Sequence, residues 1–381
     1  MKPKIILFVR QLSFARQYFD YLLSALSTKY DIYIFHTNNL ESSNINENCP
    51  YINYDISNLS HKKVQSLLNK INPSDLLVTN IRSLLDIYIF ITCNMNNIPL
   101  TYIEHGLTLN KISRFKASNK YHSLIKYLNY CKKVIGYLLS CRNPISNFRT
   151  IKRAIINSDY TGIKLNNALL YAPGSKGVLD KHFDLSKTII RYSGYPIVNK
   201  NSDLQFLLKS ITKKQAVYIH QPLIIDNFSE LSISDEVELL QELNDIFKKN
   251  NYSLIIKLHP RDDIRNYKNK LPNCNIIGTE MDIHQLIASS EIVLGHFSTA
   301  LLTAVLLKKS LYILDYWKIK NDANKFFSPI APTISKSSEI ELIFTDRNTN
   351  TRKMTDSFIK NIIGFDNSKE ARIQKLEKLL C

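Results

Sequence analysis

Short apolar runs rich in β-branched residues alternate with segments of helical periodicity along most of this chain, and this alternation restricts the fold more than any other feature. Strands that alternate with helices predict βαβ units and a parallel sheet. The expected strands are 4–10, 31–36, 75–80, 98–103, 215–220, 253–258, 275–277, 291–295 and 311–315. Two more are expected at 169–175, a short strand that leads into a turn, and at 189–196, a strand that ends in a Gly/Pro turn. The expected helices are 14–30, 60–72, 86–96, 121–141, 176–182, 234–250, 282–289 and 299–308.

Length and composition fit a folded protein with two domains. A chain of 381 residues exceeds what one core comfortably supports, and its hydrophobic content of 44% is that of a packed protein. No apolar run approaches the roughly 18–20 residues that a membrane span needs. We therefore predict the α/β class with two doubly wound, Rossmann-like domains at 1–200 and 210–345, followed by a helical tail at 346–381.

The cysteines and the net charge restrict the compartment and the partners. Six cysteines are scattered, with neither a C-x-x-C pair nor a His/Cys cluster at metal-ligand spacing. This pattern favours reduced thiols, a cytoplasmic protein and no bound metal. The net charge of +17 calls for an anionic partner, and the candidates are nucleic acid, anionic lipid and an acidic polymer.

A basic segment lies between residues 111 and 153. It holds eleven Lys or Arg residues and no Asp or Glu, with aromatic and aliphatic residues interleaved. An apolar face with a basic flank is typical of a helix on an anionic membrane surface, and we predict that role for residues 121–141. The alternative is a core helix whose basic side faces solvent. Nucleic acid is not expected as a partner, because the sequence holds no zinc finger, RNA-recognition signature or convincing helix-turn-helix.

Three polar groups of residues each follow a predicted strand, which is where open α/β sheets bind their ligands. The first group is Glu104-His105-Gly106. A histidine takes up a proton near neutral pH and a neighbouring carboxylate can orient it, so His105 suits a general base that deprotonates a hydroxyl group, with Glu104 as its partner. Gly106 would let the backbone turn sharply so that a bulky acceptor can approach. The alternative is an ordinary turn with Glu104 at the surface.

The second group, residues 257–261, suits a phosphate. The imidazole of His259 and the cationic side chains of Lys257 and Arg261 could stabilise the charge on a leaving phosphate. Pro260 would prevent the loop from continuing the strand.

The third group is Ser298-Thr299, directly before an apolar helix. Hydroxyl and N–H groups at a helix start can bind an anion, although a plain N-cap would use the same residues. Asp262 and Asp263 are expected as possible caps of the helix that follows the second group. Weaker candidates to contact a nucleotide are Gly174, Ser175 and His220.

The sequence excludes several enzyme classes. It has no G-x-G-x-x-G, G-x-x-x-x-G-K-[ST] or G-x-S-x-G motif, so nothing indicates hydride transfer, phosphoryl transfer from ATP or a serine nucleophile elbow. A base in one domain and an anion-stabilising set in the other suit group transfer from a phosphate-activated donor to an alcohol. We therefore predict that His105 and His259 face each other across an interdomain cleft.

Glu104-His105-Gly106, His259-Pro260 and Ser298-Thr299 resemble, in order, the acidic-acidic-Gly, His-Pro and Ser-Ser/Thr motifs of the bacterial sialyltransferase and polysialyltransferase families. The chain is thus similar to GT-B glycosyltransferases, whose two Rossmann-like domains face a central cleft. The resemblance implies an inverting, metal-independent transfer from a CMP-activated nonulosonic acid, with no bound cofactor. It also implies that the residue before the glycine is the base, that the histidine of His-Pro assists the leaving nucleotide, and that the hydroxyl pair binds its phosphate.

One position departs from that pattern, because His105 stands where the sialyltransferases have a second acid. A His-Gly pair there is similar to the poly(alditol phosphate) transferases, which use CDP-glycerol or CDP-ribitol. Both resemblances imply a cytidine nucleotide donor and a lipid-linked or lipopolysaccharide acceptor at the inner face of the cytoplasmic membrane, which the basic segment would contact. The remaining alternative is a non-catalytic basic protein that tethers an acidic polymer or a membrane lipid.

Overall fold

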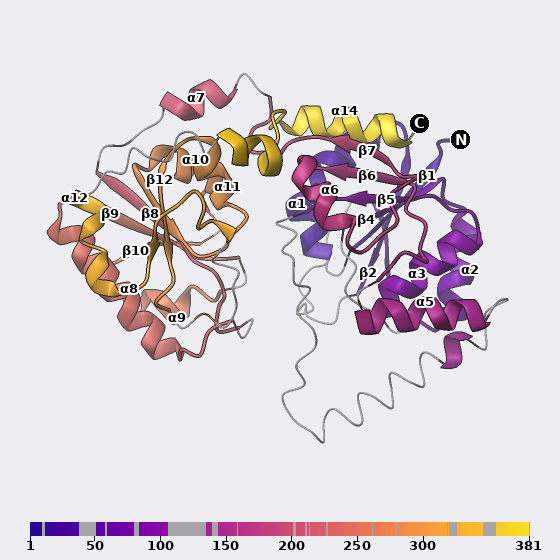
Figure 1. Cartoon of the computed structure of the whole chain (residues 1–381), viewed down its shortest axis with the longest axis horizontal. Helices are drawn as coiled ribbons and strands as arrows, with labels where there is room; N and C mark the ends of the chain where they lie inside the picture. The colour runs from indigo at the N-terminus through magenta and orange to yellow at the C-terminus, as the bar shows by residue number, and fades with distance from the viewer. Residues whose placement is uncertain are drawn as a thin grey trace. The chain divides into compact units, whose positions relative to one another are not determined.

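The computed structural model consists of two compact units (Figure 1). The first comprises Met1–Gly194 together with Lys369–Cys381, and the second comprises Tyr195–Ser368. Gly194, where the chain first leaves the first unit, has a φ of 68°, a conformation that a side chain would disfavour. The structure describes residues 1–9, 12–37, 51–57, 59–79, 84–105, 135–138, 144–157, 159–200, 203–209, 212, 214–225, 228–260, 262–278, 280–317, 319, 326–345 and 356–380.

A seven-stranded parallel sheet forms the centre of the first unit. Its order is β3-β2-β1-β4-β5-β6-β7, so the direction of winding reverses between β1 and β4, as in a doubly wound fold. Strands such as β4 and β5 are buried along their whole length because helices cover both faces. The strands are β1 (Lys4–Phe8), β2 (Asp31–His36), β3 (Ile52–Asp55), β4 (Asp75–Val78), β5 (Leu100–Ile103), β6 (Asn167–Leu170) and β7 (Ile189–Tyr192).

Helices pack on both faces of this sheet. One face carries α1 and α14, and the other carries α2, α3 and α5 (Figure 1). The limits of α2 follow from its sequence, because the Ser60 hydroxyl accepts the N–H of Lys63 at its start and Asn72 ends it in the left-handed conformation. The helices are α1 (Leu12–Leu26), α2 (His61–Ile71), α3 (Leu84–Met95), α5 (Pro144–Asn157), α6 (Pro173–Leu179) and α14 (Lys369–Leu380).

The second unit repeats the architecture with a six-stranded parallel sheet. Its order is β10-β9-β8-β11-β12-β13, with the reversal between β8 and β11. Ser232 and Asp235 form a capping box at the start of α8, the longest helix described in this unit. The strands are β8 (Gln215–Ile219), β9 (Ser253–Lys257), β10 (Asn275–Ile277), β11 (Ile292–Gly295), β12 (Ser310–Leu314) and β13 (Thr333–Ile334). The helices are α7 (Asp203–Lys209), α8 (Ile233–Lys249), α9 (Arg265–Lys268), α10 (Ile283–Ser289), α11 (Leu301–Leu306), α12 (Leu342–Thr345), the 3-10 helix η2 (Ser337–Glu339) and the π-helix η3 (Ile359–Ile363).

The α/β class with two parallel, doubly wound sheets is confirmed, and a few elements differ from expectation. The short edge strands β3 and β13 were not predicted, because neither carries a continuous apolar run. Residues 173–175, expected to be a turn, form the first turn of α6, since a proline fits the first position of a helix. Of the expected helix at 121–141, only residues 135–138 lie within the described residues, and they are helical.

The C-terminal helix α14 belongs to the core of the first unit. Leu376 and Leu379 are buried in the cluster that α1 forms with the sheet. The carbonyl of Leu379 accepts a hydrogen bond of 3.1 Å from the side chain of Asn167, and Glu377 pairs with Lys29 at 3.0 Å. Residues 369–380 therefore complete a hydrophobic face that the first 194 residues leave open.

Leu376→Ala should lower the free energy of unfolding by about 2–5 kcal/mol, because it leaves a cavity in a packed core. Lys378→Ala, an exposed change on the same helix, should stay within about 0.5 kcal/mol of the wild type. Urea unfolding followed by circular dichroism measures both. Equal effects of the two changes would show that α14 is not part of this core.

Candidate active site

Glu104 directly follows β5, and its backbone and side chain are both held. Its N–H donates to the carbonyl of Leu169 at 2.9 Å, and its carboxylate accepts the N–H of Tyr171 at 2.6 Å. Its carbonyl accepts a hydrogen bond of 2.5 Å from the guanidinium of Arg372 in α14. Glu104 is buried, so the alternative in which it lies at the surface of a turn is wrong. Its carboxylate joins the carboxyl ends of β5 and β6.

His105 directly follows Glu104, whose backbone and side chain are held by these hydrogen bonds. It is half-buried, and its ring centroid lies 5.4 Å from that of Phe19 in α1. Gly174 and Ser175 lie in the first turn of α6, directly after β6, and therefore at the same edge of the sheet as Glu104. Gly106 lies outside the described residues. The first unit thus gathers the predicted base and its carboxylate at the carboxyl ends of parallel strands, where ligands bind in this fold.

The loop after β9 is closed by Asp262. The N–H of His259 donates to the Asp262 carboxylate at 3.0 Å, and the N–H of Asp262 donates back to the His259 carbonyl at 2.9 Å. His259 is half-buried and Pro260 is exposed at the tip, while Arg261 lies outside the described residues. Asp262 therefore closes this loop, whereas Asp263, the second expected cap, accepts the N–H of Arg265, the first residue of α9, at 3.0 Å.

Lys257 points inward, although the sequence placed it among the phosphate contacts. It is buried, and its ammonium donates to the carbonyls of Gly278 and Leu258. Burial lowers the pKa of this lysine, against the opposing effect of Glu280 and Asp282. Its described hydrogen bonds join the ends of β9 and β10, which is a structural function.

His220, at the end of β8, is also turned into the protein instead of towards a nucleotide. Its Nδ1 lies 2.7 Å from the Asp262 carboxylate and its Nε2 lies 3.0 Å from that of Glu236 in α8. The second oxygen of Glu236 accepts the hydroxyl of Tyr267 at 2.7 Å. Burial lowers the pKa of His220, but the hydrogen bonds and charges of the two carboxylates outweigh it and raise the pKa to about 9. His220 is therefore a buried imidazolium that holds Asp262, and through it the backbone of His259.

The end of β11 carries the hydroxyl pair. The hydroxyl of Ser298 accepts the N–H of Ala300 at 3.3 Å, and the carbonyls of Ser298 and Thr299 accept the first hydrogen bonds of the helical turn before α11. The side chain of Gln221, which follows β8, accepts the N–H of Phe297 at 2.9 Å. The Ser298 hydroxyl thus stabilises a local turn before α11, whose N-cap, Ala300, has no side-chain capping bond. This loop lies at the switch point between β8 and β11.

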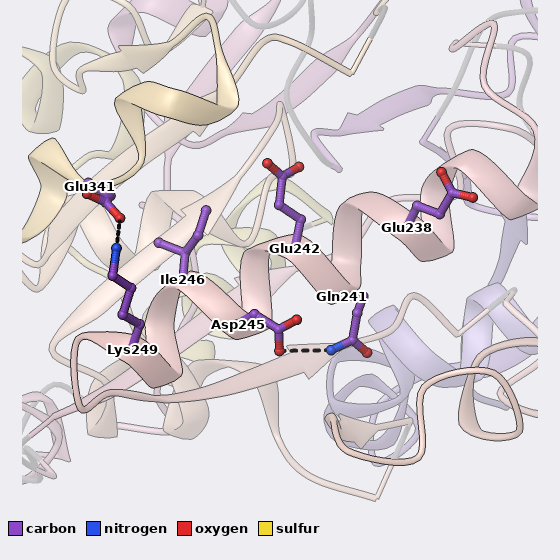
Figure 2. Close-up of a pocket in the computed structure, with 7 residues that line it drawn as sticks. All are labelled: Glu238, Gln241, Glu242, Asp245, Ile246, Lys249 and Glu341. Atoms are coloured by element: carbon purple, nitrogen blue, oxygen red, sulfur yellow. Dashed lines mark hydrogen bonds and ion pairs between the residues drawn. The ribbon is translucent and has the colours of Figure 1, made fainter.

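A hollow on α8 is chemically unsuited to an anionic ligand (Figure 2). Two of its polar pairs are internal, Lys249 with Glu341 at 2.8 Å and Gln241 with Asp245 at 2.9 Å. The remaining acids would repel a nucleotide phosphate. Its lining residues are Glu238, Gln241, Glu242, Asp245, Ile246, Lys249 and Glu341.

No group of three or more His, Cys, Asp or Glu side chains in the described part of the chain has an arrangement that could hold a metal ion. None of the helices described combines the length and the hydropathy that a membrane crossing requires.

Four supporting residues were not predicted as part of the site: Arg372, Asp262, Glu236 and Tyr267. The side-chain hydrogen bonds that connect them to the site span 16 to 268 residues of sequence, so no local motif marks these four residues. Only for Arg372 does the sequence hold a signal, because it shares a helical face with Leu376 and Leu379 and should therefore be buried.

The raised pKa of His220 predicts a pH dependence of stability. A histidine whose pKa is about 9 in the folded protein stabilises it fully below its unfolded pKa of about 6.5 and loses that contribution as the pH rises through 9. The contribution is on the order of 2–3 kcal/mol. His220→Gln should therefore flatten the fall in the free energy of unfolding between pH 7 and about pH 10, while His182→Gln should leave it unchanged. Parallel curves for all three proteins would contradict the assignment.

The family model described as alpha-2,8-polysialyltransferase (POLYST) matches residues 31–311. No curated protein sequence is similar enough to this chain to count as a match.

Solved structures resemble the chain over its whole length. The wall teichoic acid polymerase TagF, determined with CDPG, has a TM-score of 0.56 at 15% identity, covering 100% of this chain and 88% of that one. The UDP-GlcNAc 2-epimerase of Methanocaldococcus jannaschii has a TM-score of 0.53 at 16% identity, covering 100% and 99% of the two chains. MurG of Acinetobacter baumannii has a TM-score of 0.51 at 8% identity, covering 99% of each chain. At such identities the likeness shows the fold, which is GT-B.

The family match spans residues 31–311 of a 381-residue chain and includes all three motifs. The chain therefore belongs to the alpha-2,8-polysialyltransferase family and is a glycosyltransferase of the GT-B fold.

Proposed function

We propose that this glycosyltransferase moves a nonulosonic acid from a CMP-activated donor to a hydroxyl group of a bacterial surface glycan, either capsule or lipopolysaccharide. One observation carries the proposal. In each unit a histidine follows a parallel strand next to a buried carboxylate that binds a backbone N–H: His105 beside Glu104, and His259 beside Asp262. Fixed backbones at strand ends are what a base and a leaving-group residue need in order to be pre-organised.

In the proposed reaction His105 is the base. The acceptor hydroxyl loses its proton to the imidazole, and its oxygen attacks the anomeric carbon of the donor from the face opposite the nucleotide. The bond from that carbon to the phosphate oxygen breaks, and CMP leaves with the electron pair. The new bond forms with inversion, no metal ion takes part, and Glu104 holds the backbone from which His105 projects.

The leaving phosphate is proposed to bind in the second unit. His259, with Arg261, would neutralise the negative charge that develops on the phosphate, and the hydroxyls of Ser298 and Thr299 would bind its oxygens. The net charge of +17 suits an acceptor that carries a carboxylate on every sugar. His220 and Lys257 support the loops and do not touch the nucleotide in this proposal.

A second candidate is transfer of an alditol phosphate from CDP-glycerol or CDP-ribitol. It is favoured by His105 in place of a second acid, and by the similarity to a teichoic acid polymerase solved with CDPG. The acceptor hydroxyl would then attack the phosphorus that bears the alditol, and CMP would again leave. The same base and the same phosphate contacts serve both reactions, so only the donor distinguishes them.

A donor panel tests the proposal. CMP-N-acetylneuraminic acid, CDP-glycerol, CDP-ribitol and UDP-N-acetylglucosamine are each incubated with a fluorescent α2,8-linked oligosialic acid and, in parallel, a lipid-linked acceptor. Mass spectrometry of the product should show the mass of a nonulosonic acid added from the CMP donor, in buffer that contains EDTA. Addition of an alditol phosphate would establish the second candidate, and addition from the UDP donor would overturn both.

His105→Ala and His259→Ala should each reduce kcat by at least about 100-fold, because each removes a group that handles a proton or a charge in the transition state. Their unfolding midpoints should stay close to that of the wild type, since both imidazoles are half-buried. His182→Ala serves as the matched control and should retain full activity. Near-normal turnover in either site variant would remove that histidine from the mechanism.

We further propose that the enzyme binds the inner face of the cytoplasmic membrane through the end of the basic segment that forms α5. Asn147, Ile151 and Ala154 bury one side of this helix against the unit. Ile145 and Phe148 are 71% and 47% exposed, and at helical spacing they share a stripe with Arg149 and Lys152, which are also exposed. On such a stripe the apolar side chains can insert into a membrane surface, while the basic side chains bind its anionic head groups.

Vesicle sedimentation measures this contact. The wild type should bind vesicles of phosphatidylcholine with phosphatidylglycerol, and binding should weaken at 0.5 M NaCl because salt screens the charge. Ile145→Ser with Phe148→Ser should reduce the bound fraction several-fold, whereas Phe206→Ser, which changes an exposed phenylalanine of the second unit, should not. Binding that both variants share with the wild type would place the membrane contact elsewhere.

A further inference from the structure

The guanidinium of Arg372 is buried at the carboxyl ends of three neighbouring strands of the first unit. It donates to the carbonyl of Glu104 after β5 at 2.5 Å and to the hydroxyl of Ser193 after β7 at 2.7 Å. Its carbon Cζ lies 4.9 Å from the centre of the Tyr171 ring, after β6. Arg372 itself is 2% exposed and belongs to α14, near the other end of the sequence.

Anchoring of α14 does not explain this arginine. Leu376 and Leu379 already bury the helix in the core of the first unit, and the side chain of Asn167 binds its last turn. Burial of a guanidinium is unfavourable unless its N–H groups are satisfied, and here the partners described are neutral: a carbonyl, a hydroxyl and an aromatic face. A leucine at this position would pack without that penalty, so burial of the helix alone does not account for the guanidinium.

The hydrogen bond to Glu104 connects the guanidinium to the residue directly before His105. The carbonyl that Arg372 binds belongs to the peptide group between Glu104 and His105. The guanidinium therefore fixes the orientation of this peptide plane, to which the backbone of His105 is attached. Hydrogen bonds to Leu169 and Tyr171 hold the N–H and the side chain of Glu104, and the bond from Arg372 holds its carbonyl. A fork of N–H groups sets direction as well as distance, which a lysine ammonium does not.

We propose that Arg372 is a positioning residue for His105, supplied to the site by the C-terminal helix. The inference rests on the proposed function of His105 as the base and adds a residue to that site. Through one peptide group, Arg372 aims the imidazole at the acceptor hydroxyl. In this proposal α14, which completes the core of the first unit, also orients the catalytic base.

Steady-state kinetics tests the inference, with the donor of the panel above that the wild type consumes. Arg372→Ala should reduce kcat by about 10- to 100-fold, as a misplaced group does, and leave the KM for the donor within about twofold. Guanidinium chloride at 10–50 mM should restore part of the kcat of this variant and none of that of His105→Ala. Arg372→Lys should stay at least about tenfold slow, because it keeps the charge and loses the fork.

The matched control is Lys369→Ala, which removes another cation of the same helix, 5.5 Å from the ring of Tyr21, and should leave kcat unchanged. Folded Arg372 variants with a kcat near that of the wild type would overturn the inference while His105→Ala stays inactive. Failure of both Arg372 variants to fold would also overturn it, because the arginine would then serve folding alone. If His105→Ala is fully active, the proposed function fails instead.

Discussion

The structure depends on buried charged groups that bind backbone atoms at the carboxyl ends of its two parallel sheets. Glu104 and Arg372 do so in the first unit, and Asp262, fixed by His220, does so in the second. Removing one partner of such a bond leaves a buried polar group unsatisfied, so each loop has one strongly preferred position. Both candidate histidines stand on loops of this kind.

The two sheets could be predicted from the sequence because strands buried on both faces are continuous apolar runs, as in β4 and β9. Because the apolar runs also mark where the strands end, the three motifs could be placed at strand ends. Edge strands such as β3 could not be predicted, because most of their side chains are exposed and they lack the apolar run that marks a buried strand. The orientation of the Lys257 side chain could not be predicted either. The residues before it are all apolar, so no alternation of polar and apolar residues indicates which side of the strand Lys257 faces.

The support of the site could not be predicted, because its partners are separated in the chain. Asp262 lies 42 residues from His220, and Arg372 lies 268 residues from Glu104. A local pattern assigns Asp262 to a helix cap, and only the fold brings it to an imidazole. The motif residues themselves are recognisable because their chemistry is concentrated in two or three consecutive positions, whereas the residues that hold them are recognisable only in three dimensions.

The central claim is that the loop of His259 binds a cytidine nucleotide. Isothermal titration calorimetry of the full chain with CMP, CDP and UMP tests it most directly. The account predicts that CMP and CDP bind at least about tenfold more tightly than UMP, that His259→Ala weakens CMP binding by a similar factor, and that His105→Ala does not. Binding of UMP as tight as that of CMP, or CMP binding that is unchanged in His259→Ala, would contradict it.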